Sequence, residues 1–113
     1  MNESECVFKM EIIKTLEQFD QVTSHGKNIV VFSAEWCGDC IFIKPHLPTI
    51  EMNFPEWKFS FVNRDDLILL CKDLDIYGIP SFLAFVDGEI VGRLVSKDRK
   101  TPPEIEAFIK NLG

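Results

Sequence analysis

The chain has 113 residues, 46% of them hydrophobic, and a net charge of -6 at neutral pH. This length and composition predict a single domain over residues 1–113 with one hydrophobic core and no linker. The negative charge argues against nucleic acid and anionic membranes as partners. The first 14 residues include three glutamates and no apolar run of signal-peptide length, so we expect a cytoplasmic protein in a reducing compartment.

The N-terminal half predicts a strand or helix start, then a helix, then a strand. Residues 8–13 are apolar enough for an edge strand or for the opening of a helix. Apolar residues recur at helical spacing over 16–22, and the stretch 24–28 favours a turn after them. Residues 29–33 are apolar on both faces and rich in β-branched side chains, which is typical of a central strand.

A longer helical pattern runs from residue 40 to residue 53 and contains Pro45. Proline lacks the backbone donor of a helix interior, so we expect a kink that separates the first turn from the rest. Residues 58–63 alternate as a strand. The acidic pair at 65–66 suits the N-terminus of a short helix that continues to residue 74.

Two more strands and a last helix complete the chain. Residues 81–86 and 89–95 flank Asp87-Gly88, which is a strong hairpin signal, so these strands should be antiparallel. The sequence Thr-Pro-Pro-Glu at 101–104 predicts a helix start with a capping box. The apolar side chains within 105–112 then share one helix face.

Cys37 and Cys40 lie three positions apart, directly after the predicted central strand and at the head of the next helix. Unpaired backbone N–H groups and the helix dipole favour a thiolate there, and the thiolate is the nucleophile of disulfide exchange. The second thiol faces the same side of the helix, so it can attack a mixed disulfide formed by the first. The pair therefore predicts a dithiol redox switch.

The residues alone leave a structural disulfide or a metal site open as alternatives. A zinc or iron–sulfur site within one chain would need two more ligands at a paired spacing. The remaining candidates have no such spacing: Cys6, His25, His46 and Cys71. A cluster shared between two chains through Cys37 and Cys40 is a better alternative than a site within one chain, but no metal is expected.

Three segments together resemble the thioredoxin family: Trp36-Cys37-Gly38-Asp39-Cys40, Pro45 five residues later, and Gly78-Ile79-Pro80. The resemblance covers nearly the whole chain. It implies an α/β thioredoxin fold, with a mixed sheet of four or five strands covered by helices on both faces. It also implies a thiol–disulfide oxidoreductase that reduces protein disulfides and contributes to cell redox homeostasis.

The resemblance assigns roles to individual residues. Cys37 would be the exposed nucleophile and Cys40 the more buried resolving thiol. The other implied site residues are Trp36, which would cover the sulfurs, Gly38 and Asp39, which would tune them, and Ile79 and Pro80, which would bind the substrate beside a cis peptide bond. No bound cofactor is implied. Electrons would come from an NADPH-dependent flavoprotein reductase of the thioredoxin reductase kind, and the protein would act as a monomer.

The chain departs from the family pattern at several positions. Val31 and Phe61 stand where the family has a buried Asp and a Lys, which predicts slow deprotonation of Cys40 or a proton taken by water or another group. Asp39 replaces the usual proline, and its negative charge near both sulfurs predicts a potential at the reducing end of the family. Residues 96–97 replace a glycine-containing loop of the client groove, so client recognition should differ.

The remaining conspicuous residues have simpler interpretations. Cys71 lies among leucines and is expected to be a small buried hydrophobe, with a regulatory thiol as the alternative. Residues 97–100 are expected to form a solvated turn. His46 is expected on a helix surface. An alternative for the whole protein is a client-binding module with slow or vestigial redox activity.

Overall fold

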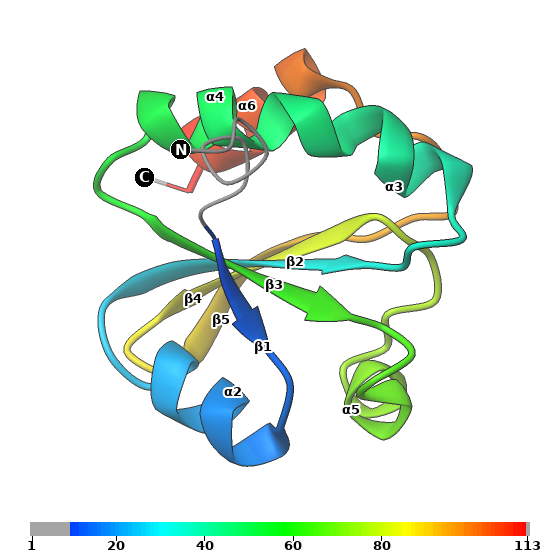
Figure 1. The fold of residues 1–113 in the computed structure, drawn as a ribbon. Coiled ribbons are helices and arrows are strands. Elements are labelled where there is room, and N and C mark those ends of the chain that lie inside the picture. Colours follow the sequence, from blue (N-terminus) through cyan, green and yellow to red (C-terminus); the bar gives the residue numbers. More distant parts are fainter. Residues whose placement is uncertain (1–9, 113) are drawn as a thin grey trace, which may run out of the picture.

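The computed structural model describes residues 10–112 and contains a five-stranded sheet between two layers of helices (Figure 1). In chain order the strands are β1 (Glu11–Ile13), β2 (Lys27–Ser33), β3 (Lys58–Asn63), β4 (Ser81–Val86) and β5 (Glu89–Leu94). Across the sheet the order is β1-β3-β2-β4-β5. Strands β1 and β2 run parallel to β3, whereas β4 runs antiparallel to both β2 and β5. The sheet is therefore mixed, as the sequence predicts.

Helices cover both faces of the sheet (Figure 1). One face carries α3 (Gly38–Ile43), α4 (Leu47–Asn53) and α6 (Pro102–Lys110), and the other carries α2 (Leu16–Thr23) and α5 (Ile68–Asp73). Each layer encloses its own cluster of buried apolar side chains. None of these helices is long and apolar enough to cross a membrane, within the part of the chain that the structure describes.

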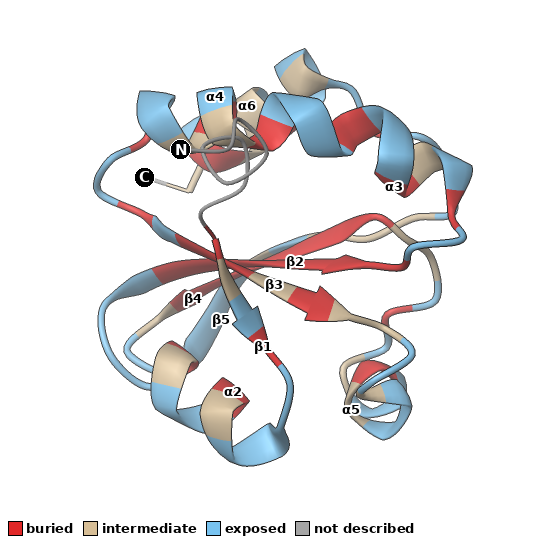
Figure 2. Ribbon diagram, viewed as in Figure 1, coloured by how far each residue is buried: buried red, intermediate tan, exposed pale blue. Residues whose placement is uncertain are grey.

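Strand β2 lies at the centre of the sheet and is buried along its whole length after Lys27 (Figure 2). Its residues alternate between the two cores: Ile29 and Val31 pack under the α3–α4–α6 layer, and Val30 and Phe32 under the α2–α5 layer. Burial on both faces explains why the strand is apolar without alternation. Val31 is 0% exposed, so the position of the family's buried acid is part of the apolar core.

The predicted kink at Pro45 is a short 3₁₀ helix, Lys44–His46, between α3 and α4. It leaves α3 as a separate segment that begins at the two thiols. At the other end of the chain, α6 begins where the sequence predicts, and the Thr101 N–H donates to Glu104 Oε1 at 3.4 Å. The apolar face of α6 packs against the first core through Ile105 and Ile109.

Several predicted boundaries need correction. Strand β2 begins at Lys27, so residues 27 and 28 belong to this strand and not to the predicted turn. The acidic pair at 65–66 does not begin a helix, because α5 starts only at Ile68. The Asp65 N–H instead donates to Asn63 Oδ1 at 2.9 Å and forms a turn after β3. At the N-terminal end, the open choice for residues 8–13 resolves to an edge strand at Glu11–Ile13, while residues 8 and 9 lie outside the described part.

Truncation of Phe59 should show that the sheet depends on the first core. Phe59 is 1% exposed and lies opposite Ile29 in the β2–β3 register. We expect Phe59→Ala to lower the free energy of unfolding by about 3–5 kcal/mol in urea denaturation, because it leaves a cavity between sheet and helices. Met52→Ala, at a side chain that is 78% exposed, is the control and should cost less than ~0.5 kcal/mol. Equal effects of the two substitutions would contradict this packing.

Candidate active site

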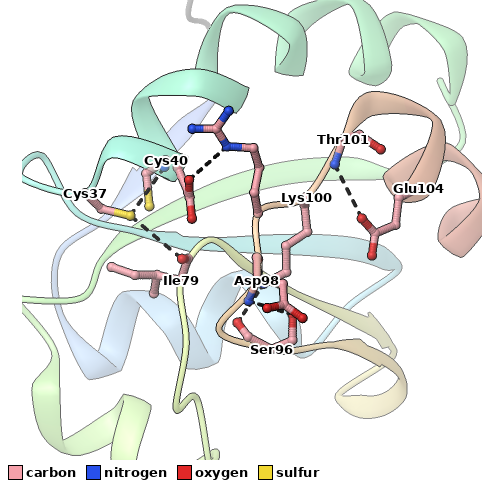
Figure 3. Close-up of polar contacts among 10 residues, drawn as sticks. Cys37, Cys40, Ile79, Ser96, Asp98, Lys100, Thr101 and Glu104 are labelled. Atoms are coloured by element: carbon pink, nitrogen blue, oxygen red, sulfur yellow. Dashed lines mark hydrogen bonds and ion pairs between the residues drawn. The ribbon is translucent and has the colours of Figure 1, made fainter.

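The site has two parts, the segment with Cys37 and Cys40 and the segment with Ile79 and Pro80. The register between β2 and β4 brings these two parts together. Phe32 near the end of β2 lies opposite Ser81 at the start of β4. The chain that leaves β2 toward Cys37 therefore runs beside the chain that enters β4 through Ile79 and Pro80. The Ile79–Pro80 peptide bond is cis. The Cys37 thiol donates to the Ile79 carbonyl oxygen at 3.7 Å (Figure 3).

Cys37 is the N-cap residue of α3, with an extended backbone. The Cys40 N–H donates to the Cys37 sulfur at 3.3 Å, so one of the unpaired donors of the helix start is directed at the nucleophile candidate. Such a bond strengthens when the sulfur carries negative charge. The two thiols are packed with Ala34 and Ile79.

Cys37 is less accessible than the sequence led us to expect. It is buried, with 9% of its surface exposed, because Ala34 and Ile79 pack against it. It is still the more accessible of the two thiols, since Cys40 is only 2% exposed. The expected order of accessibility therefore holds, but the expected exposure of Cys37 was wrong.

Burial, which is the largest cause, and the hydrogen bond with Cys37 together raise the pKa of the Cys40 thiol to about 11. The Ser33 side chain and the Ala34 backbone act the other way and favour the Cys40 thiolate. Ser33 is itself buried at the end of β2. It is a polar neighbour of the resolving thiol that the sequence analysis did not assign.

A cleft of about 340 Å³ opens beside Cys40. Its lining includes Ser33 and Phe61, and it does not include Val31. Charged groups of both signs also line it: Lys14, Glu35, Lys44 and Asp66. Cys40 therefore borders a cleft that contains charged groups, although its own side chain is almost fully buried.

Trp36 is 62% exposed. Its indole N–H donates to Asp65 Oδ2 at 2.8 Å, and the guanidinium of Arg64 lies 5.8 Å from the ring centroid. The turn after β3 thus fixes the orientation of the ring. Ala34 and Ile79 are the apolar residues that pack with the thiols, and the covering role of Trp36 stays a prediction.

Asp39, between the two cysteines, has a partner that the sequence analysis missed. Its carboxylate accepts a hydrogen bond from Arg99 Nε at 2.9 Å, and the two groups form an exposed ion pair. The guanidinium also lies 4.4 Å from the ring centroid of Phe42. Arg99 places a positive charge beside the negative charge of Asp39, so the effect of Asp39 on the thiols is partly offset.

Residues 97–100 are not a solvated turn throughout, because Lys100 is 0% exposed. Its ammonium group donates to the carbonyl oxygens of Ser96 at 2.7 Å and Asp98 at 2.8 Å (Figure 3). Burial lowers the pKa of Lys100, and nearby negative groups counteract this shift. The pattern of charged residues suggested solvation, whereas the backbone carbonyls satisfy the buried cation.

Cys71 is the other cysteine that the structure describes, and it lies apart from this site. Cys71 is 3% exposed in the second core, as expected for a small hydrophobe, and burial raises the pKa of its thiol. Cys6 lies outside the described residues. Between residues 10 and 112, no group of three or more His, Cys, Asp or Glu side chains is arranged to hold a metal ion.

Comparison with known proteins agrees with this geometry. The family model described as Thioredoxin matches residues 10–111. The chain belongs to the thioredoxin family. It is 35% identical to an H-type thioredoxin of Fagopyrum esculentum over 80 residues, which cover 70% of this chain and 69% of that protein. It is 32% identical to thioredoxin of Chlamydia pneumoniae over 97 residues, covering 85% and 88% of the two chains.

The fold agrees with solved thioredoxins as well. The structure of Malassezia sympodialis thioredoxin superposes with a TM-score of 0.79 at 26% identity, covering 92% of this chain and 93% of that one. This thioredoxin-family protein is a thiol–disulfide oxidoreductase of the protein-disulfide reductase type, with the Cys-x-x-Cys pair at Cys37 and Cys40. The client-binding module is not favoured.

The pKa of Cys40 predicts a steep pH dependence for release of the reduced client. Attack on the mixed disulfide requires the Cys40 thiolate, whose fraction rises about tenfold per pH unit below a pKa of about 11. We expect the single-turnover release rate to rise with nearly this slope from pH 7 to pH 10 in stopped-flow fluorescence. A rate that levels off below pH 8 would mean that another group deprotonates Cys40 efficiently.

Removal of Arg99 should slow reactions of Cys37. Arg99→Met leaves the Asp39 charge without its partner, so we expect iodoacetamide to alkylate Cys37 up to about fivefold more slowly at pH 7 in a variant that lacks Cys6. Asp39→Asn should accelerate alkylation. Arg99→Met should have a smaller effect in the Asp39→Asn background, because Asp39 holds the guanidinium in place. Additive effects of the two substitutions would contradict this coupling.

Proposed function

We propose that Cys37 is the nucleophile and Cys40 the resolving thiol in the reduction of protein disulfides. The observation that carries this assignment is the environment of Cys37. Its sulfur accepts the Cys40 N–H at 3.3 Å at the start of α3, and it is the more exposed of the two thiols. A directed donor and access for a substrate are what a nucleophilic thiolate needs.

The reaction then has two exchange steps. The Cys37 thiolate attacks one sulfur of the client disulfide, a bond forms between these two sulfurs, and the other client sulfur leaves as a thiolate that takes up a proton. The Cys40 thiolate next attacks the Cys37 sulfur and displaces the second client sulfur. The client gains two electrons and two protons, and the protein is left with a Cys37–Cys40 disulfide.

Ile79 and Pro80 form the proposed client-binding edge. The Ile79 carbonyl already contacts the Cys37 sulfur, so an extended client strand beside this residue would bring its disulfide close to the nucleophile. Gly38 supports access from the other side, since nothing lies within 4 Å of the place where a side chain would begin. Trp36 adds an exposed aromatic surface next to the thiols.

The proton of Cys40 is proposed to leave through the cleft beside it. Val31 and Phe61 provide no acid at the family's position, but Ser33 favours the Cys40 thiolate and lines the same cleft as Glu35 and Asp66. Ser33 would orient the departing proton, and water or one of these carboxylates would accept it. Asp39 and Arg99 together would tune the potential of the pair.

The electron source and the cellular setting are also proposals. The chain needs no bound cofactor for thiol–disulfide exchange, but each turnover leaves a disulfide that must be reduced. An NADPH-dependent flavoprotein reductase is the proposed donor, because the family resemblance implies one. We propose a monomer in a reducing cytoplasm, in keeping with the net charge of -6.

The decisive experiment is reduction of insulin disulfides, together with titration of the Cys37/Cys40 pair in glutathione and dithiothreitol buffers. We expect catalytic turnover with dithiothreitol as donor. Cys40→Ser should abolish turnover and trap a mixed disulfide on Cys37, because the second exchange step is lost. Cys71→Ala, at a buried thiol in the second core, is the matched control and should keep full turnover. A stable reduced pair without turnover would instead support the client-binding alternative.

A further inference from the structure

Lys100 is a buried cation that the redox mechanism above does not use. Removing an ammonium group from water costs several kcal/mol unless the protein replaces its hydration. Its hydrogen bonds here go to two backbone carbonyls, those of Ser96 and Asp98. An apolar side chain of similar length would be buried without this cost, whereas the Lys100 ammonium holds these two carbonyls in place.

One of these carbonyls packs against the proposed client-binding edge. Gly78 lies so close to the Ser96 carbonyl that a Cβ at position 78 would overlap it. Gly78 directly precedes Ile79, whose own carbonyl receives the Cys37 thiol. Contacts therefore run without a break from the Lys100 ammonium through Ser96 and Gly78 to the nucleophile.

Further bonds tie the same two segments together. The Tyr77 hydroxyl donates to the Val95 carbonyl at 3.0 Å, one residue before Ser96. The Ser81 hydroxyl donates to the Gly78 carbonyl. Residues 77–81 are thus held in two ways: by contacts with residues 95 and 96, and by the bond to Ser81 at the start of β4. Lys100 stabilises the contacts with residues 95 and 96, because it binds the Ser96 carbonyl.

Arg99 connects the 96–100 segment to the opposite side of the site. Lys100 points inward to Ser96 and Asp98 (Figure 3). Arg99 binds Asp39, which stands between the two cysteines in the sequence. The segment therefore contacts both halves of the site: the client-binding edge through Ser96 and the helix with the thiols through Arg99. Of these two contacts, only the one made by Lys100 involves a buried charged side chain, since Arg99 is exposed.

We propose that Lys100 is a positioning residue that fixes Ser96 against Gly78 and so sets the position of the Ile79 edge for protein clients. This inference rests on the proposed role of Ile79 in client binding. Without Lys100, the Ser96 and Asp98 carbonyls lose their donor and turn toward water. The edge then moves relative to the Cys37 sulfur, and client binding weakens, whereas the reaction of Cys37 with a small disulfide needs no such edge.

The test compares Lys100→Met with Lys110→Met. Both substitutions remove one positive charge, but Lys110 is exposed at the end of α6 and lies outside the 96–100 segment. Insulin is the protein client, and the aromatic disulfide 5,5′-dithiobis(2-nitrobenzoate) is the small substrate. We expect Lys100→Met to raise the KM for insulin about tenfold with kcat within about twofold, and to leave the rate with the small disulfide unchanged. Lys110→Met should change none of these values.

An NMR measurement keeps the proposal testable without a client. In ¹H–¹⁵N spectra, Lys100→Met should shift the amide signals of Gly78 and Ile79, whereas Lys110→Met should leave them in place. Lys100→Gln, which keeps an N–H donor, should give a smaller shift and a smaller rise in KM, and it replaces Lys100→Met in every comparison if that variant does not fold.

The outcomes separate this proposal from the proposed function. If the unsubstituted protein fails to reduce insulin, the assigned redox function fails, and the NMR signals alone decide the role of Lys100. Unchanged Gly78 and Ile79 signals in Lys100→Met would overturn the positioning role. An equal loss with insulin and with the small disulfide would overturn it as well, because it would show a general effect on the thiols.

Discussion

The antiparallel register of β2 with β4 is the constraint on which the site depends. It places Phe32 opposite Ser81, and thereby brings the thiol segment beside the Ile79–Pro80 segment. Because β2 is buried on both faces, a slip by one residue would exchange its side chains between two differently shaped cores, so the register is strongly specified. The 3.7 Å contact between the Cys37 thiol and the Ile79 carbonyl follows from core packing rather than from local attraction.

Charge near the thiols has a different source here than the family pattern implies. The sheet supplies none at the expected positions, since Val31 is part of the apolar core and its register partner is Phe61. The 96–100 segment supplies cations instead, with Arg99 at the surface on Asp39 and Lys100 buried on backbone carbonyls. With the cations on a loop, the sheet needs no buried ion pair. The desolvation cost of such a pair can exceed the attraction between its two charges.

The sequence pattern was sufficient to predict the helices, the strands and the position of the thiols. It was insufficient to predict the contacts that surround the thiols. Strands β3 and β4 begin and end as predicted, and the Asp87-Gly88 hairpin adopts positive φ angles of 49° and 90°. In contrast, Lys100 carries no local signal of burial, because its partners are backbone carbonyls that every sequence contains. Arg99 and Asp39 are separated by 60 residues, so only the folded chain shows that they pair.

The raised pKa of Cys40 does not prevent it from completing the reaction. At pH 7, a thiol with a pKa of about 11 is ionised in roughly one molecule in 10⁴, about 300-fold less than a free cysteine. The more basic thiolate is intrinsically more nucleophilic and recovers about a factor of ten. A net loss near 30-fold is small beside the effective concentrations of ~10⁵ M that well-oriented intramolecular groups can reach. In the proposed mechanism, proximity at the head of α3 therefore outweighs burial, and Cys40 would outcompete millimolar external thiols for the mixed disulfide.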